Sequence, residues 1–177
     1  MTTTVPRHTG ITPFLISRTL DAPRSRVWDA WTQTSDLQAW FAPPGCTLPT
    51  IRLDLRPGGT CHYAMRTPDG HLMWGRWTFR EIAAPERLVL VQSFSDAAGG
   101  ITAHPMSPTW PRETLASTTL SESGGRTTLT VDWRVWNGTE EEHRTFDGAH
   151  AQMQQGWGGT MDQLATYLHS SRTAPAP

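Results

Sequence analysis

The middle of this chain has the residue pattern of β-strands almost throughout, and helical patterns occur only near its two ends. A tryptophan-rich helical stretch covers residues 21–41, and a long helical stripe covers residues 139–168. Between them apolar and polar residues alternate, as in antiparallel strands with one buried face. A long helix near the end of the chain can cover that face. We therefore expect an α+β fold: a curved antiparallel sheet of six to seven strands gripping one long C-terminal helix, with an internal cavity.

Turn residues separate the expected strands, and two short helices follow the first strand. The strands are expected at residues 14–20, 51–55, 60–67, 71–82, 88–94, 113–122 and 126–136. The alternation predicts one inward face, made by Leu53, Leu55, Trp77, Phe79, Leu88, Leu90, Val131 and Trp133. Residues 96–111 are rich in Gly, Pro and Ala, which predicts a loop long enough to form a lid or rim.

The C-terminal helix has a clear start signal and a single apolar stripe. Thr139 and Glu142 have the spacing of a capping box. Residues then recur every three or four positions on one helical face: Phe146, His150, Met153, Trp157, Met161, Leu164 and Leu168. A glycine inside a helix costs roughly 1 kcal/mol relative to alanine. We therefore expect close packing against a strand at Gly156, Gly158 and Gly159; close approach of a ligand or a tryptophan, or a kink, are the alternatives.

Composition and charge exclude several classes of function. The formal net charge of −1 argues against a nucleic-acid partner, and no apolar run reaches the roughly 20 residues of a membrane span. None of the 15 basic residues is Lys, which excludes a Schiff-base mechanism. We expect a flexible arm at residues 1–12, one domain at 13–169 and a disordered tail at 170–177. The arm lacks the apolar core of a signal peptide, which predicts a cytoplasmic protein.

Neither a metal ion nor another cofactor is expected. Cys46 and Cys61 are too few for a disulfide framework and too isolated for a zinc site, and Cys61 is expected to be buried. His62 and His71 could face each other across a hairpin, but no further ligand completes a recognisable set. The sequence also contains no phosphate loop, dinucleotide fingerprint or nucleophile elbow.

A series of short motifs runs along residues 13–169, each weak alone but specific in order and spacing. They are Ala22-Pro23, Val27-Trp28, Ala30-Trp31, Leu37, Trp40-Phe41, Pro43, Asp54, Arg56-Pro57-Gly58-Gly59, Met65-Arg66, Pro68-Asp69-Gly70, Gly75, Phe79-Arg80-Glu81-Ile82, Pro85-Glu86-Arg87-Leu88-Val89, Gly156-Trp157, Asp162, Leu164 and Tyr167-Leu168. The series resembles the SRPBCC superfamily, also called START-like or helix-grip proteins. Within it, the chain is most similar to the branch of homologues of the activator of heat-shock-protein-ninety ATPase.

The resemblance implies a curved sheet that grips the C-terminal helix around a cavity, but it does not imply one reaction. Relatives bind lipids or hormones, or act as polyketide cyclases, and many bacterial members have no known activity. The eukaryotic co-chaperones carry an additional N-terminal domain that this sequence lacks, so we do not expect a chaperone partner. The matching motifs are mostly turns and core positions, which report the fold better than the function.

Four polar or soft side chains are expected on the inward face: Cys61, Tyr63, Gln92 and His150. A mostly apolar pocket with a few polar groups is the usual form of a small-ligand site. His150 could be a satisfied core residue, a ligand contact, or a general base acting with Tyr63 on a polyketide-like substrate, and no second titratable group stands at a motif spacing to support catalysis. The tryptophans are expected in the core, with an aromatic-lined pocket as the alternative.

These observations predict a protein that binds a small hydrophobic or aromatic molecule, without established catalysis. The predicted ligand-binding residues are Tyr63, Trp77, Phe79, Leu90, Gln92, Trp133, His150, Met153 and Trp157. The alternatives are a cyclase or isomerase that uses His150, and a chaperone-interacting protein. No membrane partner is expected, and related folds often pair through sheet edges, which would allow a homodimer.

Overall fold

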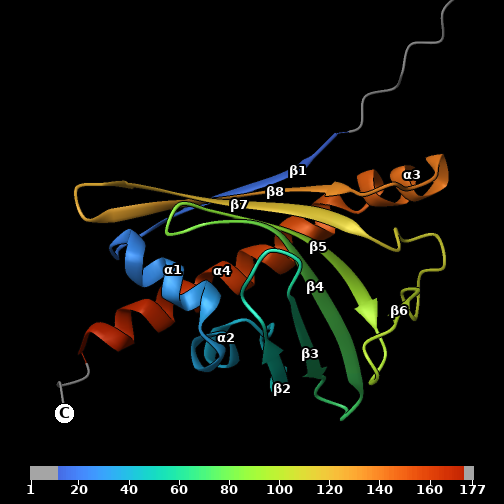
Figure 1. The fold of residues 1–177 in the computed structure, drawn as a ribbon, viewed down its shortest axis with the longest axis horizontal. Coiled ribbons are helices and arrows are strands. Elements are labelled where there is room, and N and C mark those ends of the chain that lie inside the picture. The colour runs from blue at the N-terminus through green and yellow to red at the C-terminus, as the bar shows by residue number, and fades with distance from the viewer. Residues whose placement is uncertain (1–11, 174–177) are drawn as a thin grey trace, which may run out of the picture.

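The computed structural model describes residues 12–173, and within this range eight strands form one curved antiparallel sheet (Figure 1). The strands are β1 (Phe14–Leu20), β2 (Thr47–Leu53), β3 (Thr60–Arg66), β4 (Leu72–Ala83), β5 (Arg87–Ser95), β6 (Ile101–Thr102), β7 (Thr114–Ser123) and β8 (Arg126–Val135). Seven of them follow the order β1-β8-β7-β5-β4-β3-β2, and the short β6 pairs with β5. The expected fold class is confirmed, with β6 as an additional strand inside the predicted loop.

The helices are α1 (Arg24–Thr32), α2 (Thr34–Trp40), α3 (Glu140–Gly148) and α4 (His150–Thr173). Figure 1 shows α4 crossing the inner side of the sheet, with α1 and α2 beside it at one end. Among the helices of residues 12–173, none combines the length and the hydropathy that a membrane span requires.

The strand alternation puts one set of apolar side chains into a common core. Trp77, Phe79, Leu88 and Val131 are each at most 2% exposed. Leu53, Leu55 and Trp133 are half-buried and pack against that core. The predicted inward face is therefore confirmed, because side chains two positions apart in a strand point to the same side.

The single C-terminal helix that we expected is two helices, and this correction has a local cause. The capping box is present: the Glu142 N–H donates to Thr139 Oγ1 at 3.2 Å, and Thr139 N–H donates to Glu142 Oε2 at 2.7 Å. The chain then turns after Gly148, where the Ala149 N–H donates to Phe146 O at 3.1 Å. A bond three residues back is tighter than the α-helical bond, and it ends α3.

The last residues of α4 lie in the segment that we expected to be the C-terminal tail. We expected the domain to end at residue 169, whereas α4 continues to Thr173. Residues 1–11 of the expected arm and residues 174–177 of the expected tail lie outside the described residues.

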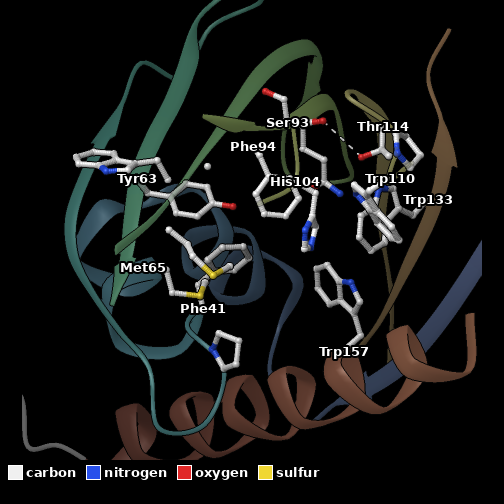
Figure 2. A pocket seen from close by; sticks show the side chains of 16 residues that line it. Phe41, Tyr63, Met65, Ser93, Phe94, His104, Trp110, Thr114, Trp133 and Trp157 are labelled. Carbon is white, nitrogen blue, oxygen red and sulfur yellow. Dashed lines mark hydrogen bonds between the residues drawn. The ribbon is translucent and has the colours of Figure 1, made fainter. Parts of the chain in front are cut away.

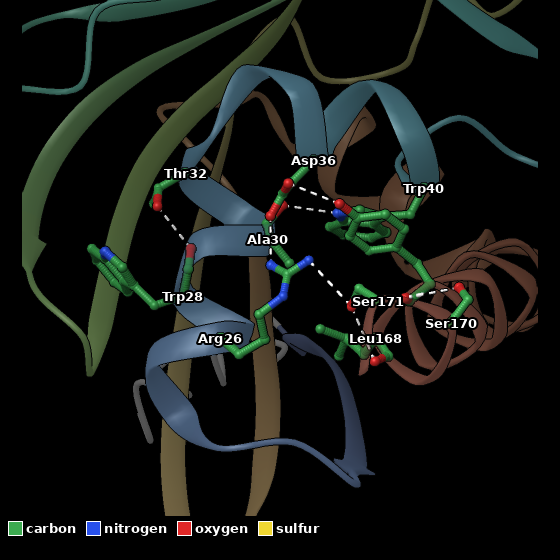
Figure 3. A network of polar contacts seen from close by, with 10 residues as sticks. Arg26, Trp28, Ala30, Thr32, Asp36, Trp40, Leu168, Ser170 and Ser171 are labelled. Carbon is green, nitrogen blue, oxygen red and sulfur yellow. Dashed lines mark hydrogen bonds and ion pairs between the residues drawn. The ribbon is translucent and has the colours of Figure 1, made fainter. Parts of the chain in front are cut away.

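Asp36 of α2 joins three helices at the end of the sheet where α1 and α2 lie, through an ion pair with α1 and a hydrogen bond from α4 (Figure 3). Arg26 Nη1 of α1 lies 2.5 Å from Asp36 Oδ2 of α2, and Tyr167 Oη of α4 donates to Asp36 Oδ1 at 2.8 Å. The Arg26 guanidinium also lies over the Tyr167 ring, 5.1 Å from its centroid. The Asp36 side chain is only 16% exposed, so these contacts replace much of the hydration that its carboxylate loses.

Asp36→Ala should lower the free energy of unfolding by about 2 kcal/mol, because it leaves Arg26 and Tyr167 without their shared acceptor. The matched control is Asp54→Ala, which removes the partner of Arg56 in a pair whose side chains are 51% and 68% exposed. An exposed pair contributes about 0–1 kcal/mol. Urea unfolding of both variants measures the difference, and equal losses would contradict a larger contribution of the buried Asp36 contacts than of the exposed Asp54 pair.

The glycines of α4 do not pack as we expected. A Cβ on Gly156 or Gly158 would meet no atom within 4 Å, and one on Gly159 would meet only Pro44, at 3.9 Å. The expectation of close packing against a strand is therefore wrong for all three glycines, because Pro44 lies in the loop before β2.

Gly156→Ala should consequently stabilise the protein by about 1 kcal/mol, because alanine has the higher helix propensity and the new methyl group meets open space. For a chain of this size the expected rise in Tm is about 2–4 °C. Gly59→Ala is the contrasting variant, since its Cβ would come within 3.0 Å of the Asp54 carbonyl oxygen. In thermal unfolding, the Tm should rise for Gly156→Ala and fall for Gly59→Ala. A lower Tm for Gly156→Ala would contradict a stabilising effect of alanine at this position.

Candidate functional site

A cavity of about 340 Å³ lies between the inner face of the sheet, the segment between β6 and β7, and α4 (Figure 2). Its walls come from β3, β4, β5, β7, β8 and α4, and from the segments that follow α2 and β6. The lining residues are Phe41, Pro43, Tyr63, Met65, Met73, Trp74, Gly75, Gln92, Ser93, Phe94, His104, Trp110, Pro111, Thr114, Trp133 and Trp157. None of them is Asp, Glu, Arg or Lys, so the cavity offers aromatic rings, two thioethers and a few neutral polar groups.

The aromatic walls are held by contacts between rings. Trp157 of α4 stacks on Trp31 of α1, with centroids 6.3 Å apart and planes at 13°. Trp157 also meets Trp133 of β8 edge to face at 6.2 Å and 75°. On the opposite wall, Phe41 meets Tyr63 of β3 edge to face at 5.6 Å and 87°. Edge-to-face and offset ring pairs are the favoured arrangements, so the walls are stabilised by their own packing.

Tyr63 brings a hydroxyl group into the cavity. Burial raises the pKa of its phenol above the ordinary value, so the group remains a neutral hydroxyl at physiological pH. Gly75 of β4 lies opposite Tyr63 in the sheet register. A Cβ on Gly75 would lie within 3.0 Å of three atoms of the Tyr63 side chain, including Oη. The absence of a side chain at Gly75 therefore makes the room that the Tyr63 ring occupies.

His104 is the second polar group that reaches into the cavity, from the segment between β6 and β7 (Figure 2). Its ring lies 4.5 Å from Phe94 and 6.1 Å from Trp110, measured between centroids. The Met106 N–H donates to His104 Nδ1 at 3.0 Å. Burial lowers the pKa of His104, which favours the neutral imidazole. No sequence pattern marks His104 as a site residue, although the composition of residues 96–111 predicted a lid or rim in the loop that carries it.

The structure brings together four of the nine predicted ligand-binding residues. Tyr63, Gln92, Trp133 and Trp157 line the cavity. The other predicted sheet residues and Met153 are buried in the packed core outside this lining: Trp77, Phe79, Leu90 and Met153. The cavity occupies only one end of the inner face, so an inward-pointing side chain need not reach it.

His150 lies outside the cavity lining, at the start of α4. Its ring packs against Phe14 at 5.7 Å and against Phe146 at 5.3 Å. Its Nε2 atom is 3.9 Å from Asp147 Oδ1, beyond hydrogen-bond distance. The structure therefore does not bring His150 and Tyr63 together as a base and an orienting group in this cavity.

A second hollow, of about 390 Å³, lies on the outer face of the sheet and is polar. It is lined by Arg52, Leu53, Asp54, Thr60, His62, Arg76, Ala98 and Gly99. His62 Nε2 lies 3.0 Å from Asp96 O, and Arg76 Nη1 donates to Gly99 O at 2.8 Å. These side chains hold the turn at residues 96–100, from which the chain continues to the wall of the inner cavity that carries His104.

The structure does not pair His62 with His71. His62 lies opposite Arg76 in the register of β3 and β4, and His71 lies in the turn, 3.5 Å from Asp69. Within residues 12–173 no group of three His, Cys, Asp or Glu side chains could hold a metal ion. Cys61 is fully buried, and burial raises the pKa of its thiol to about 12, so it is a protonated core residue.

Comparison with known proteins gives a family match and a set of similar structures. The family described as "Activator of Hsp90 ATPase homolog 1-like protein" matches residues 21–169. No curated protein matches the chain. A solved structure from Arthrobacter aurescens is 28% identical, covers 89% of this chain and 86% of its own, and has a TM-score of 0.72.

Two further solved structures share the fold. A protein from Mycobacterium smegmatis is 23% identical to this chain, and the alignment covers 92% of this chain and 91% of that chain with a TM-score of 0.70. The AHSA1 protein from Silicibacter pomeroyi is 15% identical, with 90% and 99% covered and a TM-score of 0.70. At these identities the likeness concerns the arrangement of sheet and helices and carries no information about a ligand.

Proposed function

The chain belongs to the Activator of Hsp90 ATPase homolog 1-like family, as its motifs indicated, and on this premise we propose that it binds a flat, neutral small molecule in the inner cavity. One observation carries the proposal: a cavity of about 340 Å³ whose lining contains aromatic rings and no charged side chain. Ligand sites are usually concave and mostly apolar, with a small number of polar groups that orient the ligand.

The lining argues for the chemical class of the ligand. An anion or a cation would lose its hydration in the cavity without finding a counter-charge, which is costly. An aromatic or other planar ligand would instead replace water against Phe41, Phe94 and the tryptophans, and so gain apolar contact. A cyclase or isomerase activity is less well supported, because the candidate base His150 lies outside this lining.

Native mass spectrometry of the freshly purified protein tests the proposal. We expect a reproducible small-molecule adduct that solvent extraction removes and identifies. Trp136→Ala is the control, because its ring lies outside the lining, next to Arg80, and its loss should leave the adduct unchanged. A clean apo mass, together with no saturable quenching of tryptophan fluorescence by a planar aromatic probe such as 2-acetylnaphthalene, would contradict small-molecule binding.

A further inference from the structure

We propose that His104 selects ligands carrying a hydrogen-bond acceptor of the carbonyl class, because it presents an Nε2–H donor to the aromatic cavity. This inference rests on the proposed function and adds the specificity-determining residue. His104 is a cavity residue of this chain that the family motifs do not include.

The donor at Nε2 follows from the contact on the other side of the ring. The backbone N–H of Met106 donates to His104 Nδ1 at 3.0 Å, so Nδ1 must be the unprotonated nitrogen. In a neutral imidazole one nitrogen carries the proton and the other accepts, so the proton is then on Nε2. Backbone geometry within one loop therefore fixes the tautomer before any ligand arrives.

The surroundings keep the ring neutral. No carboxylate lines the cavity that could pair with an imidazolium, and the ring lies between Phe94, at 4.5 Å, and Trp110, at 6.1 Å. Burial lowers the pKa of His104 in the same direction. Protonation would also convert Nδ1 into a donor and break its hydrogen bond with the Met106 N–H. The cavity thus offers a neutral N–H donor at this point.

The same tautomer excludes a role of His104 Nε2 as a general base. Because Nε2 already carries the proton, it cannot accept one from an acidic carbon of a bound substrate. The arrangement suits a group that donates to a carbonyl oxygen, while Tyr63 supplies a neutral hydroxyl from β3. The matching ligand is planar and uncharged, with a ketone or related acceptor at its edge.

Two probes of nearly equal shape isolate this acceptor: 2-acetylnaphthalene, which has a carbonyl oxygen, and 2-ethylnaphthalene, which does not. Their dissociation constants are measured by tryptophan fluorescence quenching on the full chain. The readout is the ratio of the two constants in each protein, because differences in probe hydration then cancel between proteins. His104→Phe should weaken the binding of the ketone relative to that of the hydrocarbon by roughly three- to tenfold, which is the contribution of one net hydrogen bond. His150→Phe, which alters a histidine outside the lining, should leave the ratio as in the wild type.

A second measurement does not depend on any variant. Long-range ¹H–¹⁵N NMR of the histidine rings should show His104 with an unprotonated Nδ1 and a protonated Nε2, and 2-acetylnaphthalene should shift the Nε2 resonance. A proton on Nδ1 would overturn the inference, as would an unchanged ratio in His104→Phe. If both probes bind and the ratio is unchanged, the proposed function stands without this specificity. If neither probe binds the wild type, the proposed function fails, and the inference fails with it.

Discussion

Gly75→Ala should weaken the binding of a planar ligand on the order of tenfold or more, because the new methyl group displaces the Tyr63 ring into the cavity. The added Cβ would lie within 3.0 Å of the Tyr63 Cζ, Oη and Cε2 atoms. Gly75 is buried between neighbouring strands, so the backbone has little room to shift. The ring must therefore move, which takes space from the cavity of about 340 Å³ and disturbs the contact of Tyr63 with Phe41 in its wall. Overpacking should also lower the free energy of unfolding by about 1–3 kcal/mol.

The double variant Gly75→Ala/Tyr63→Ala tests whether the clash is the cause. Removing the ring removes the steric conflict, so the two substitutions should be strongly non-additive in stability and in probe affinity. Probe affinity is measured by fluorescence quenching with 2-acetylnaphthalene, and stability by urea unfolding. Gly156→Ala controls for the substitution itself, since its Cβ meets no atom within 4 Å. Wild-type affinity in Gly75→Ala would show that the cavity near Tyr63 takes no part in binding.

The sheet could be predicted from the sequence because its signal is local. Alternation along β8 puts Leu129 and Val131 in the core, where the structure finds them at most 1% exposed. The same alternation selected Tyr63, Gln92 and Trp133, and the helical stripe selected Trp157; all four line the cavity. It could not separate them from Phe79 and Leu90, because a packed position and a cavity-lining position have the same period along a strand.

The remaining features depend on contacts that no period records. His104 reaches the cavity because the turn at residues 96–100 and the short β6 direct the following loop inward, and that path is set by partners such as Arg76 and Gly99. His150 was placed on the inner stripe by helical spacing. The turn at Ala149 separates α3 from α4, and His150 instead packs against Phe14 and Phe146. Loop direction and helix breaks thus decided which histidine lines the cavity.

Trp133→Ala should have the largest effect on both stability and binding, because its ring joins several elements at the cavity wall. The ring meets Phe14 of β1 at 6.2 Å, Trp110 of the loop at 6.2 Å, Phe146 of α3 at 5.5 Å and Trp157 of α4 at 6.2 Å. Truncating such a residue should lower the free energy of unfolding by about 3 kcal/mol. Loss of a central aromatic contact should weaken 2-acetylnaphthalene binding by roughly thirtyfold.

Trp133→Phe separates packing from hydrogen bonding at the same position. Trp133 Nε1 is buried and has no hydrogen-bond partner among the described residues, so its indole N–H adds no stabilising bond. Phenylalanine should therefore retain most of the stability and most of the affinity that alanine loses, and Trp136→Ala, outside the lining, should change affinity little. Urea unfolding and fluorescence quenching are measured on all three variants. If Trp133→Ala loses stability while its probe affinity matches the wild type, the aromatic wall at Trp133 supports the junction of β8 with α3 and α4, and the ligand binds elsewhere.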